Sequence, residues 1–176
     1  MDKKSFSERT ILAVDNFLHP QVFSEIVTEL GSLEGWAPEI DRFDSHPPAG
    51  ESCNLKSTSK AYQEIYRELG KMFSVPLALQ RMYVNRFQPG EVPRFHVDGK
   101  VLTCLLYADP GEWNLDEYGE TQLLVNGEIR GVLPIPNRMV VFDGQLPHRA
   151  TSFLTRQRHT IATKLENVTF DDIALS

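Results

Sequence analysis

The sequence predicts a mostly β protein in which two N-terminal helices back a double-sheet jelly roll, cupin-like in outline. About eight short segments show the alternation of apolar and polar residues that is typical of strands, and most of them follow residue 78. Two segments with helical periodicity lie before that point. This number and order of elements favour two sheets packed face to face, with the helices covering one of them.

Both expected helices have recognisable ends. The first begins at Pro20, whose fixed φ suits a first helical turn, and ends at Gly31 or Gly35. The second is capped by Ser57 or Ser59. Each carries an apolar stripe that predicts packing against the outside of a sheet. The stripes comprise Val22, Phe23, Ile26, Val27, Leu30 and Leu33 in the first helix, and Tyr62, Ile65, Tyr66, Leu69, Met72 and Phe73 in the second.

The strands are predicted from alternation and from the turns between them. Asn126-Gly127 is a strong hairpin signal, because both residues accept the positive φ of a type I′ turn. The expected strands are Ile11–Val14, Leu79–Phe87, Val101–Tyr107, Gln122–Val125, Glu128–Val132, Met139–Phe142 and Arg158–Leu165.

Residues 41–59, between the two helices, lose all periodicity and are rich in turn-forming residues. Loops of this length in compact domains often serve as lids or binding loops, so this segment is a candidate substrate lid. Cys53 is expected in its polar part, whereas Cys104 lies in an apolar run and is expected to be a small buried hydrophobe.

The composition is that of an ordinary globular chain. Its 176 residues, 41% of them hydrophobic, suffice for one core and are few for two, so a single domain over 1–176 is expected, with a helical support region to about residue 78 and a jelly-roll core over about 79–166. The net charge of −6 argues against nucleic-acid and anionic-membrane partners. The start is too polar for a signal peptide, no apolar run could span a bilayer, and two cysteines give no disulfide framework, so a cytoplasmic location is expected.

The centre of the chain carries a metal-ligand pattern. In an extended segment, His96 and Asp98 share a face while Val97 packs behind them. His148, which follows the apolar strand Met139–Phe142, can supply a third ligand. Two imidazoles and one carboxylate on one face of an octahedron leave the opposite positions open, and this arrangement suits non-haem Fe(II).

Ten residues beyond His148, Arg158 begins a strand in which Thr160 shares its face. A planar guanidinium beside a hydroxyl is a good receiver for a carboxylate. The pair therefore predicts a site for a dicarboxylate co-substrate.

With these residues in this order and spacing, the chain resembles the Fe(II)- and 2-oxoglutarate-dependent dioxygenases, in particular their prolyl-hydroxylase-like branch. The resemblance covers Leu79 to Leu165, roughly half of the chain. It implies a double-stranded β-helix, with Fe(II) held by His96, Asp98 and His148.

The resemblance also implies the co-substrates. Arg158 would pair with the far carboxylate of 2-oxoglutarate, which Tyr107 or Thr160 would hydrogen-bond. O2 would be consumed, succinate and CO2 formed, and a C–H bond hydroxylated, with ascorbate as an optional reductant. Asp98 favours hydroxylation over halogenation, because halogenating relatives lack this carboxylate, and desaturation and ring closure stay open as alternative outcomes.

Three positions depart from the family pattern. Phe87 stands where relatives have a tyrosine, and Tyr118 and Asn137 stand where they have glycines. Tyr118 makes a different backbone conformation there an expectation, whereas asparagine accepts positive φ and should preserve its turn.

The substrate class stays open between a peptidyl proline, a free amino acid and a small metabolite. Candidate contacts are Arg86, Arg94, Trp113 and Lys164. The alternative function is a jelly-roll module that binds metal without turnover. The sequence does not define the oligomeric state.

Overall fold

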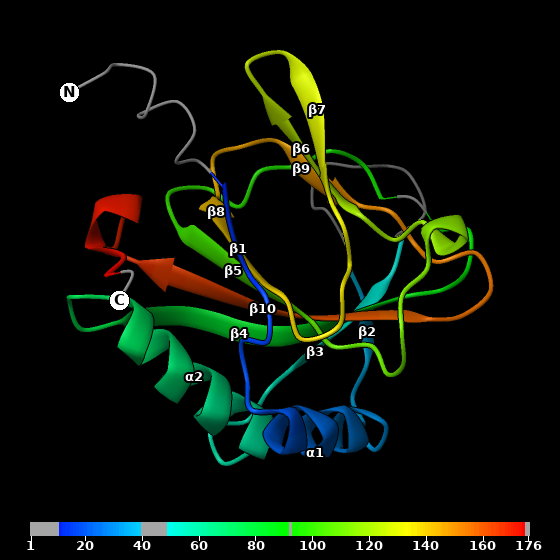
Figure 1. Cartoon of the computed structure of the whole chain (residues 1–176), viewed down its shortest axis with the longest axis horizontal. Coiled ribbons are helices and arrows are strands. Elements are labelled where there is room, and N and C mark those ends of the chain that lie inside the picture. The colour runs from blue at the N-terminus through cyan, green and yellow to red at the C-terminus, as the bar shows by residue number, and fades with distance from the viewer. Residues whose placement is uncertain (1–10, 40–48, 92, 175–176) are drawn as a thin grey trace.

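The computed structural model of the chain describes residues 11–39, 49–91 and 93–174. Figure 1 shows three layers: a pair of helices, a large sheet, and a small sheet on the opposite side of the large one. The elements are β1 Ile11–Val14, α1 Pro20–Leu30, β2 Ala37–Pro38, β3 Glu51–Asn54, α2 Lys60–Met72, β4 Ala78–Phe87, β5 Leu102–Tyr107, η2 Leu115–Glu117, β6 Thr121–Val125, β7 Glu128–Val132, β8 Met139–Asp143, β9 His148–Ala150, β10 Arg158–Glu166 and η3 Phe170–Asp172.

The large sheet has seven strands in the order β1-β8-β5-β10-β4-β3-β2, and the small sheet has three in the order β7-β6-β9. All the named strand pairs are antiparallel. β10 pairs with β5 on one side and with β4 on the other. The prediction of a mostly β, two-sheet protein with helices near its N-terminal side is confirmed.

The two helices form where the sequence predicts them. In α1, Pro20 occupies the first turn and Gly31 follows the last residue. In α2, the Ser59 hydroxyl accepts a hydrogen bond from the Tyr62 backbone N–H, which satisfies one of the free donors at the helix start. Both apolar stripes pack against the large sheet, with Ile26, Ile65 and Leu69 fully buried.

The large sheet has two different faces, because alternate residues of a strand point to opposite sides. The outer face, toward the helices, is apolar and includes Met82, Val84, Cys104, Leu106, Met139, Val141, Ile161 and Leu165. The inner face, toward the small sheet, mixes apolar and polar side chains. By register it carries Tyr83, Asn85 and Phe87 of β4, Thr103, Leu105 and Tyr107 of β5, Val140 and Phe142 of β8, and Arg158, Thr160, Ala162 and Lys164 of β10.

The backbone φ angles confirm the turns predicted at Asn126-Gly127 and at Asn137. Asn126 and Gly127, with φ of 53° and 82°, join β6 to β7 as the expected hairpin. Asn137 takes a φ of 63° in place of a glycine, and its side chain also exchanges two hydrogen bonds with the Leu18 backbone, at 2.9 and 2.7 Å. Tyr118 has a φ of 56°, which is uncommon for a residue other than glycine.

The candidate lid over 41–59 needs correction in its described part. Residues 51–54 form β3, which pairs with β4 inside the large sheet and therefore cannot act as a loop that opens and closes. Cys53, expected in a polar loop, is buried on this strand. Residues 41–48 of the candidate lid lie outside the described residues, as does the polar start of the chain. Neither described helix is both long and apolar enough to cross a membrane.

Candidate metal centre and co-substrate pocket

His96, Asp98 and His148 meet between the two sheets. One possible ligand atom from each lies within 4.8 Å of the other two. A backbone bridge between His96 and His148, with N–H to oxygen distances of 3.0 and 2.9 Å, fixes the two histidines side by side. Residues 96–98, expected as an extended strand, make only this bridge and belong to no named strand, and Val97, expected to pack behind the ligands, is 56% exposed.

The two imidazoles are oriented by backbone carbonyls. His148 Nδ1 lies 2.8 Å from the Leu146 carbonyl oxygen, and His96 Nδ1 lies 3.2 Å from that of Arg94. A carbonyl oxygen accepts a hydrogen bond from Nδ1–H, so the proton of each neutral ring stays on Nδ1 and Nε2 keeps its lone pair for a ligand. Partial desolvation and the neighbouring His148 lower the pKa of His96, which favours the neutral, metal-binding form at neutral pH.

Asp98 is held in its ionised form. Burial alone would raise its pKa, but the nearby His148 ring and the charge of Lys164 hold that pKa well below its usual range. The Lys164 ammonium is ion-paired with Asp98 Oδ2, and the Thr103 hydroxyl donates to the same oxygen at 2.7 Å. A carboxylate between two imidazoles is thus ready for a cation at neutral pH.

Gly144 lets the backbone that carries Asp98 come close. The Asp98 N–H donates to the Gly144 carbonyl at 2.7 Å, and the Gly144 N–H donates to that of Val101 at 2.8 Å. A Cβ added at Gly144 would lie 2.7 Å from the Val101 carbonyl oxygen and 3.1 Å from Asp98 Cβ. Only glycine fits this contact without a shift of the segment behind the carboxylate.

Arg158, on the same inner face of β10 as Lys164, is fully buried. Its Nε donates to the Gly119 carbonyl at 2.8 Å and its Nη2 to Thr121 Oγ1 at 3.0 Å. Among the described residues, no carboxylate lies within ion-pair distance of this guanidinium. Asp109 and Glu120 act on its charge only from beyond that distance. A buried charge without a counter-ion in contact is costly, so the position fits an anion that binds from outside the chain.

Tyr107 and Thr160 both lie beside Arg158, but their hydroxyls differ. The Tyr107 hydroxyl lies 2.8 Å from Thr121 Oγ1 and 3.1 Å from the Val132 carbonyl oxygen, to which it can donate. Thr160 Oγ1 is buried without a hydrogen-bond partner in the described structure. An orphaned hydroxyl on the face that carries Arg158 is a second sign of a missing polar ligand.

The sequence analysis missed the supporting roles of three residues. Thr121 links Tyr107 to Arg158, and Thr103 with Lys164 holds Asp98. Strand parity could have placed Thr103 on the cavity side, together with Tyr107. No local signal shows which side chain it meets there.

The expected substrate contacts are divided by the structure. Arg86 lies on the outer face, where it pairs with Glu51 and stacks over Trp36, on the side of the sheet opposite the contacts of Asp98. The Trp113 indole N–H donates to the Tyr118 carbonyl at 2.7 Å and anchors its own loop. Lys164 faces the cavity, but toward Asp98.

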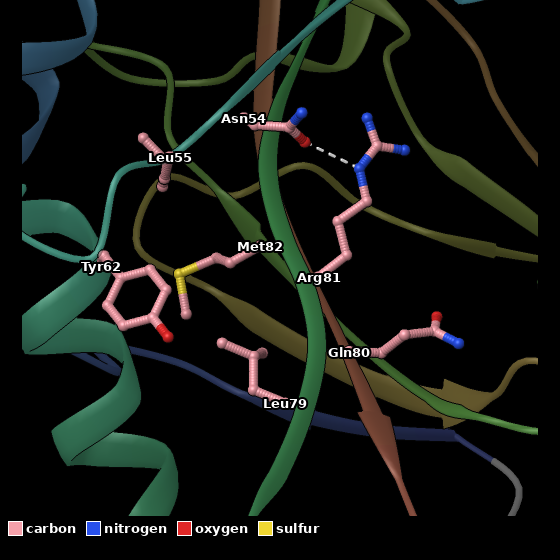
Figure 2. A pocket seen from close by; sticks show the side chains of 7 residues that line it. All are labelled: Asn54, Leu55, Tyr62, Leu79, Gln80, Arg81 and Met82. Atoms are coloured by element: carbon pink, nitrogen blue, oxygen red, sulfur yellow. Dashed lines mark hydrogen bonds between the residues drawn. The ribbon is translucent and has the colours of Figure 1, made fainter.

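A separate shallow pocket lies where α2 meets β3 and β4 (Figure 2). Leu55, Tyr62, Leu79 and Met82 line its apolar side. Arg81 at its rim donates from Nε to Asn54 Oδ1 at 2.8 Å. The pocket includes none of the residues of the metal cluster, so we do not assign the chemistry to it.

Comparison with known proteins gives agreement in structure and none in sequence. Neither models of protein families nor curated proteins match the chain. Among solved structures, it is similar to a prolyl-4-hydroxylase of Pseudomonas putida, with a TM-score of 0.71, 13% identity, and coverage of 93% of this chain and 96% of that one. A prolyl hydroxylase of Trichoplax adhaerens, solved with a peptide fragment of the hypoxia inducible factor oxygen degradation domain, has a TM-score of 0.73, 15% identity, and coverage of 93% and 86%.

HygX of Streptomyces hygroscopicus, solved with nickel, 2-oxoglutarate and hygromycin B, has a TM-score of 0.69, 12% identity, and coverage of 94% of this chain and 87% of that one. At these identities the likeness defines the fold. The chain therefore has the double-stranded β-helix fold that these oxygenases share, as its sequence predicts.

Proposed function

We propose that this protein is an Fe(II)- and 2-oxoglutarate-dependent dioxygenase that hydroxylates a C–H bond of its substrate. The observation that carries the proposal is the buried Arg158 guanidinium, which has no carboxylate partner among the described residues and lies on the sheet face that also bears the contacts of Asp98. A metal cluster alone would not need a second, anion-receiving position. An oxygenase that uses a dicarboxylate needs both.

The residues of the cluster fit iron. His96 and His148 would bind it through Nε2 and Asp98 through a carboxylate oxygen, which is the ligand set that suits non-haem Fe(II). The chemistry that bound iron supplies is the coupling of 2-oxoglutarate decarboxylation, to succinate and CO2, with oxidation of a substrate by O2. The chain itself holds the ligands, keeps Asp98 ionised and packs buried side chains behind His148, while His96 stays exposed.

Arg158 would bind the far carboxylate of 2-oxoglutarate. Of the two candidate hydroxyls, that of Thr160 suits the co-substrate better, because it has no other partner. Tyr107 would act mainly by holding Thr121, which accepts a hydrogen bond from Arg158 and thereby orients the guanidinium. Ala162 leaves room on the strand between Thr160 and Lys164.

For the substrate we propose a small molecule or a flexible peptide, with a peptidyl proline as one candidate. Two solved structures of similar fold support this range, one holding a peptide fragment and one holding hygromycin B. The alternative is a metal-binding jelly-roll module without turnover. The buried, unpaired Arg158 favours the enzyme.

We also propose that residues 1–176 form one oxygenase domain. The strands β1, β2 and β3, which precede residue 78, belong to the same sheet as β4, β5, β8 and β10. The helical support region therefore contributes strands as well as helices to the scaffold of the site.

The test is an anaerobic titration of the apo protein with Fe(II) and then with 2-oxoglutarate, followed by the visible charge-transfer absorption of chelated 2-oxoglutarate. We expect the band in the wild type and in His19→Ala, which removes an exposed histidine, and its loss in His148→Ala. Iron binding without the band would favour the non-catalytic module.

A matched pair of arginines tests the co-substrate pocket. Arg158→Gln should weaken 2-oxoglutarate binding by about 10- to 100-fold, the loss expected for hydrogen bonds to a charged partner, with little effect on iron. Arg156→Gln, two residues away and bonded to the Pro110 carbonyl, should bind 2-oxoglutarate like the wild type. Equal affinities for the two variants would contradict the assignment of Arg158.

A further inference from the structure

The two oxygens of Asp98 have different surroundings. Oδ2 is ion-paired with the Lys164 ammonium and accepts the Thr103 hydroxyl at 2.7 Å. Lys164 Nζ also lies 3.3 Å from Thr103 Oγ1. An ammonium can only donate, so Thr103 accepts from Lys164 and must direct its own proton to Asp98. The three side chains form a closed set of contacts with one direction of donation.

This set leaves Oδ1 as the oxygen that can bind a cation. A carboxylate oxygen has about two lone-pair positions, and two donors fill both on Oδ2. Oδ1 faces His96 Nε2 at 3.9 Å and receives no hydrogen-bond donor from the rest of the described chain. His148 Nε2 lies 3.3 Å from Oδ2, the oxygen that the two donors already hold.

We propose that Thr103 and Lys164 are positioning residues that restrict Asp98 to binding metal through Oδ1 alone. The inference rests on the proposed function, whose metal ligands it takes over. Neither residue touches the metal in this arrangement. They act by occupying the oxygen that would otherwise be free to join Oδ1 as a second ligand.

The restriction matters because of the number of coordination positions. Three ligand atoms leave three positions of an octahedron, enough for the two oxygens of a chelating 2-oxoglutarate and for O2. If Asp98 bound through both oxygens, only two positions would stay open, and 2-oxoglutarate would fill them. The Thr103–Lys164 pair therefore preserves the position at which O2 would bind.

The location of the pair supports a dedicated role. Lys164 and Thr103 face each other across β10 and β5, and both are buried. A buried ammonium is costly unless it is paired. The partner of Lys164 is Asp98, a proposed metal ligand that must itself be ionised to bind a cation. A simple core contact would be made more cheaply by apolar side chains of the same volume.

The experiment loads purified protein with Mn²⁺ and measures both the dissociation constant and the number of metal-bound waters from water-proton relaxation. Neither readout requires turnover. Lys164→Met keeps the length of the side chain and removes its donors, so one lone pair of Oδ2 becomes available beside Oδ1, although Thr103 still donates to the other. We expect this variant to hold one fewer water per metal ion than the wild type.

Thr103→Val removes the other donor without a change of charge, and we expect it to weaken Mn²⁺ binding by about 10-fold, as is usual for the loss of a residue that orients a ligand. Thr103→Ser should restore wild-type binding. The control is Thr163→Val, which alters a buried threonine on the opposite face of β10, away from Asp98, and should match the wild type in both readouts.

Each outcome has a defined meaning. A wild-type water count in Lys164→Met, together with wild-type affinity in Thr103→Val, overturns the proposal. Failure of the wild type to bind Mn²⁺ or Fe(II) would instead contradict the proposed function. Should Thr103→Val not fold, the water count of Lys164→Met decides alone.

Discussion

The two faces of the seven-stranded sheet are built from the same strands and serve opposite purposes. The outer face is an apolar surface on which both helices pack. The inner face buries a lysine, an arginine and several hydroxyls among its apolar residues. On β10, outer-face and inner-face side chains alternate residue by residue: Ile161 faces the helices, and its neighbours Thr160 and Ala162 face the small sheet.

This difference between the two faces shows that alternate residues of one strand can serve stability and binding separately. Side chains on the outer face should matter to folding alone, and those on the inner face to both folding and binding. Five tests, in order of decreasing expected effect, examine this division.

Asp98→Asn should cause the largest loss of stability in the metal-free protein, about 4 kcal/mol, because it leaves the buried Lys164 ammonium without a counter-charge. Urea unfolding measures the change. The double variant Asp98→Asn/Lys164→Met should recover most of it. A loss no larger in Asp98→Asn than in a surface variant would show that the pair is not charged as described.

Leu106→Ala, on the outer face of β5, should cost about 3 kcal/mol through the cavity it leaves among fully buried neighbours. Iron and 2-oxoglutarate affinities, measured on the folded fraction below the denaturation midpoint, should stay those of the wild type. A selective loss of metal binding in this variant would break the separation between the faces.

Gly144→Ala should cost about 2 kcal/mol, because the new Cβ meets the Val101 carbonyl at 2.7 Å and forces the chain apart. Since the Asp98 N–H is hydrogen-bonded to the Gly144 carbonyl, the variant should also weaken metal binding. Thermal unfolding with and without Mn²⁺ measures both effects. A variant with full stability and unchanged metal affinity would show that the close approach is not required.

Thr160→Val and Thr163→Val form a matched pair, since each removes a buried hydroxyl without a partner and keeps the shape of the side chain. Both should raise the stability of the metal-free protein by about 1 kcal/mol, by relieving an unsatisfied polar group. Only Thr160→Val, on the inner face, should weaken 2-oxoglutarate binding. Equal effects of the two variants on that affinity would remove Thr160 from the proposed pocket.

Asp15→Asn should have the smallest effect, about 0.5 kcal/mol at pH 7, because the Asp15 side chain is 53% exposed and water screens its charge. The hydrogen bond from Arg138 lowers the pKa of Asp15 below its unfolded value. Its contribution is therefore present above the unfolded pKa of about 4 and is lost as the pH falls through the folded value. Urea unfolding at pH 7 and pH 3 should show the difference between the variant and the wild type shrink at the lower pH.

The sequence predicted most of the fold because its signals are local. Helix starts at Pro20 and Ser59, the Asn126-Gly127 hairpin and the alternation of β10 each depend on a few neighbouring residues. β3 was missed because its four residues follow a stretch of turn formers. What makes them a strand is pairing with β4, some thirty residues later, which no short window contains.

The same distinction holds for the candidate site. Parity placed His96 with Asp98 and Arg158 with Thr160, and the structure brings His96, Asp98 and His148 together, while their roles as ligands stay predictions. The partner of Lys164 was not foreseen, because Asp98 lies 66 residues before it and meets it only across the cavity. Contacts of this kind follow from the register of distant strands.

The alternation of side chains along β5 affects how easily the Cys104 thiol can be oxidised. This thiol lies between Thr103 and Leu105 in sequence but on the other side of the sheet, and burial raises its pKa to about 12. Oxidants attack the thiolate, which is almost absent at neutral pH under these conditions. One layer of backbone thus insulates the cysteine from the proposed iron centre, and a shift of β5 by a single residue would place sulfur where reactive oxygen would be formed.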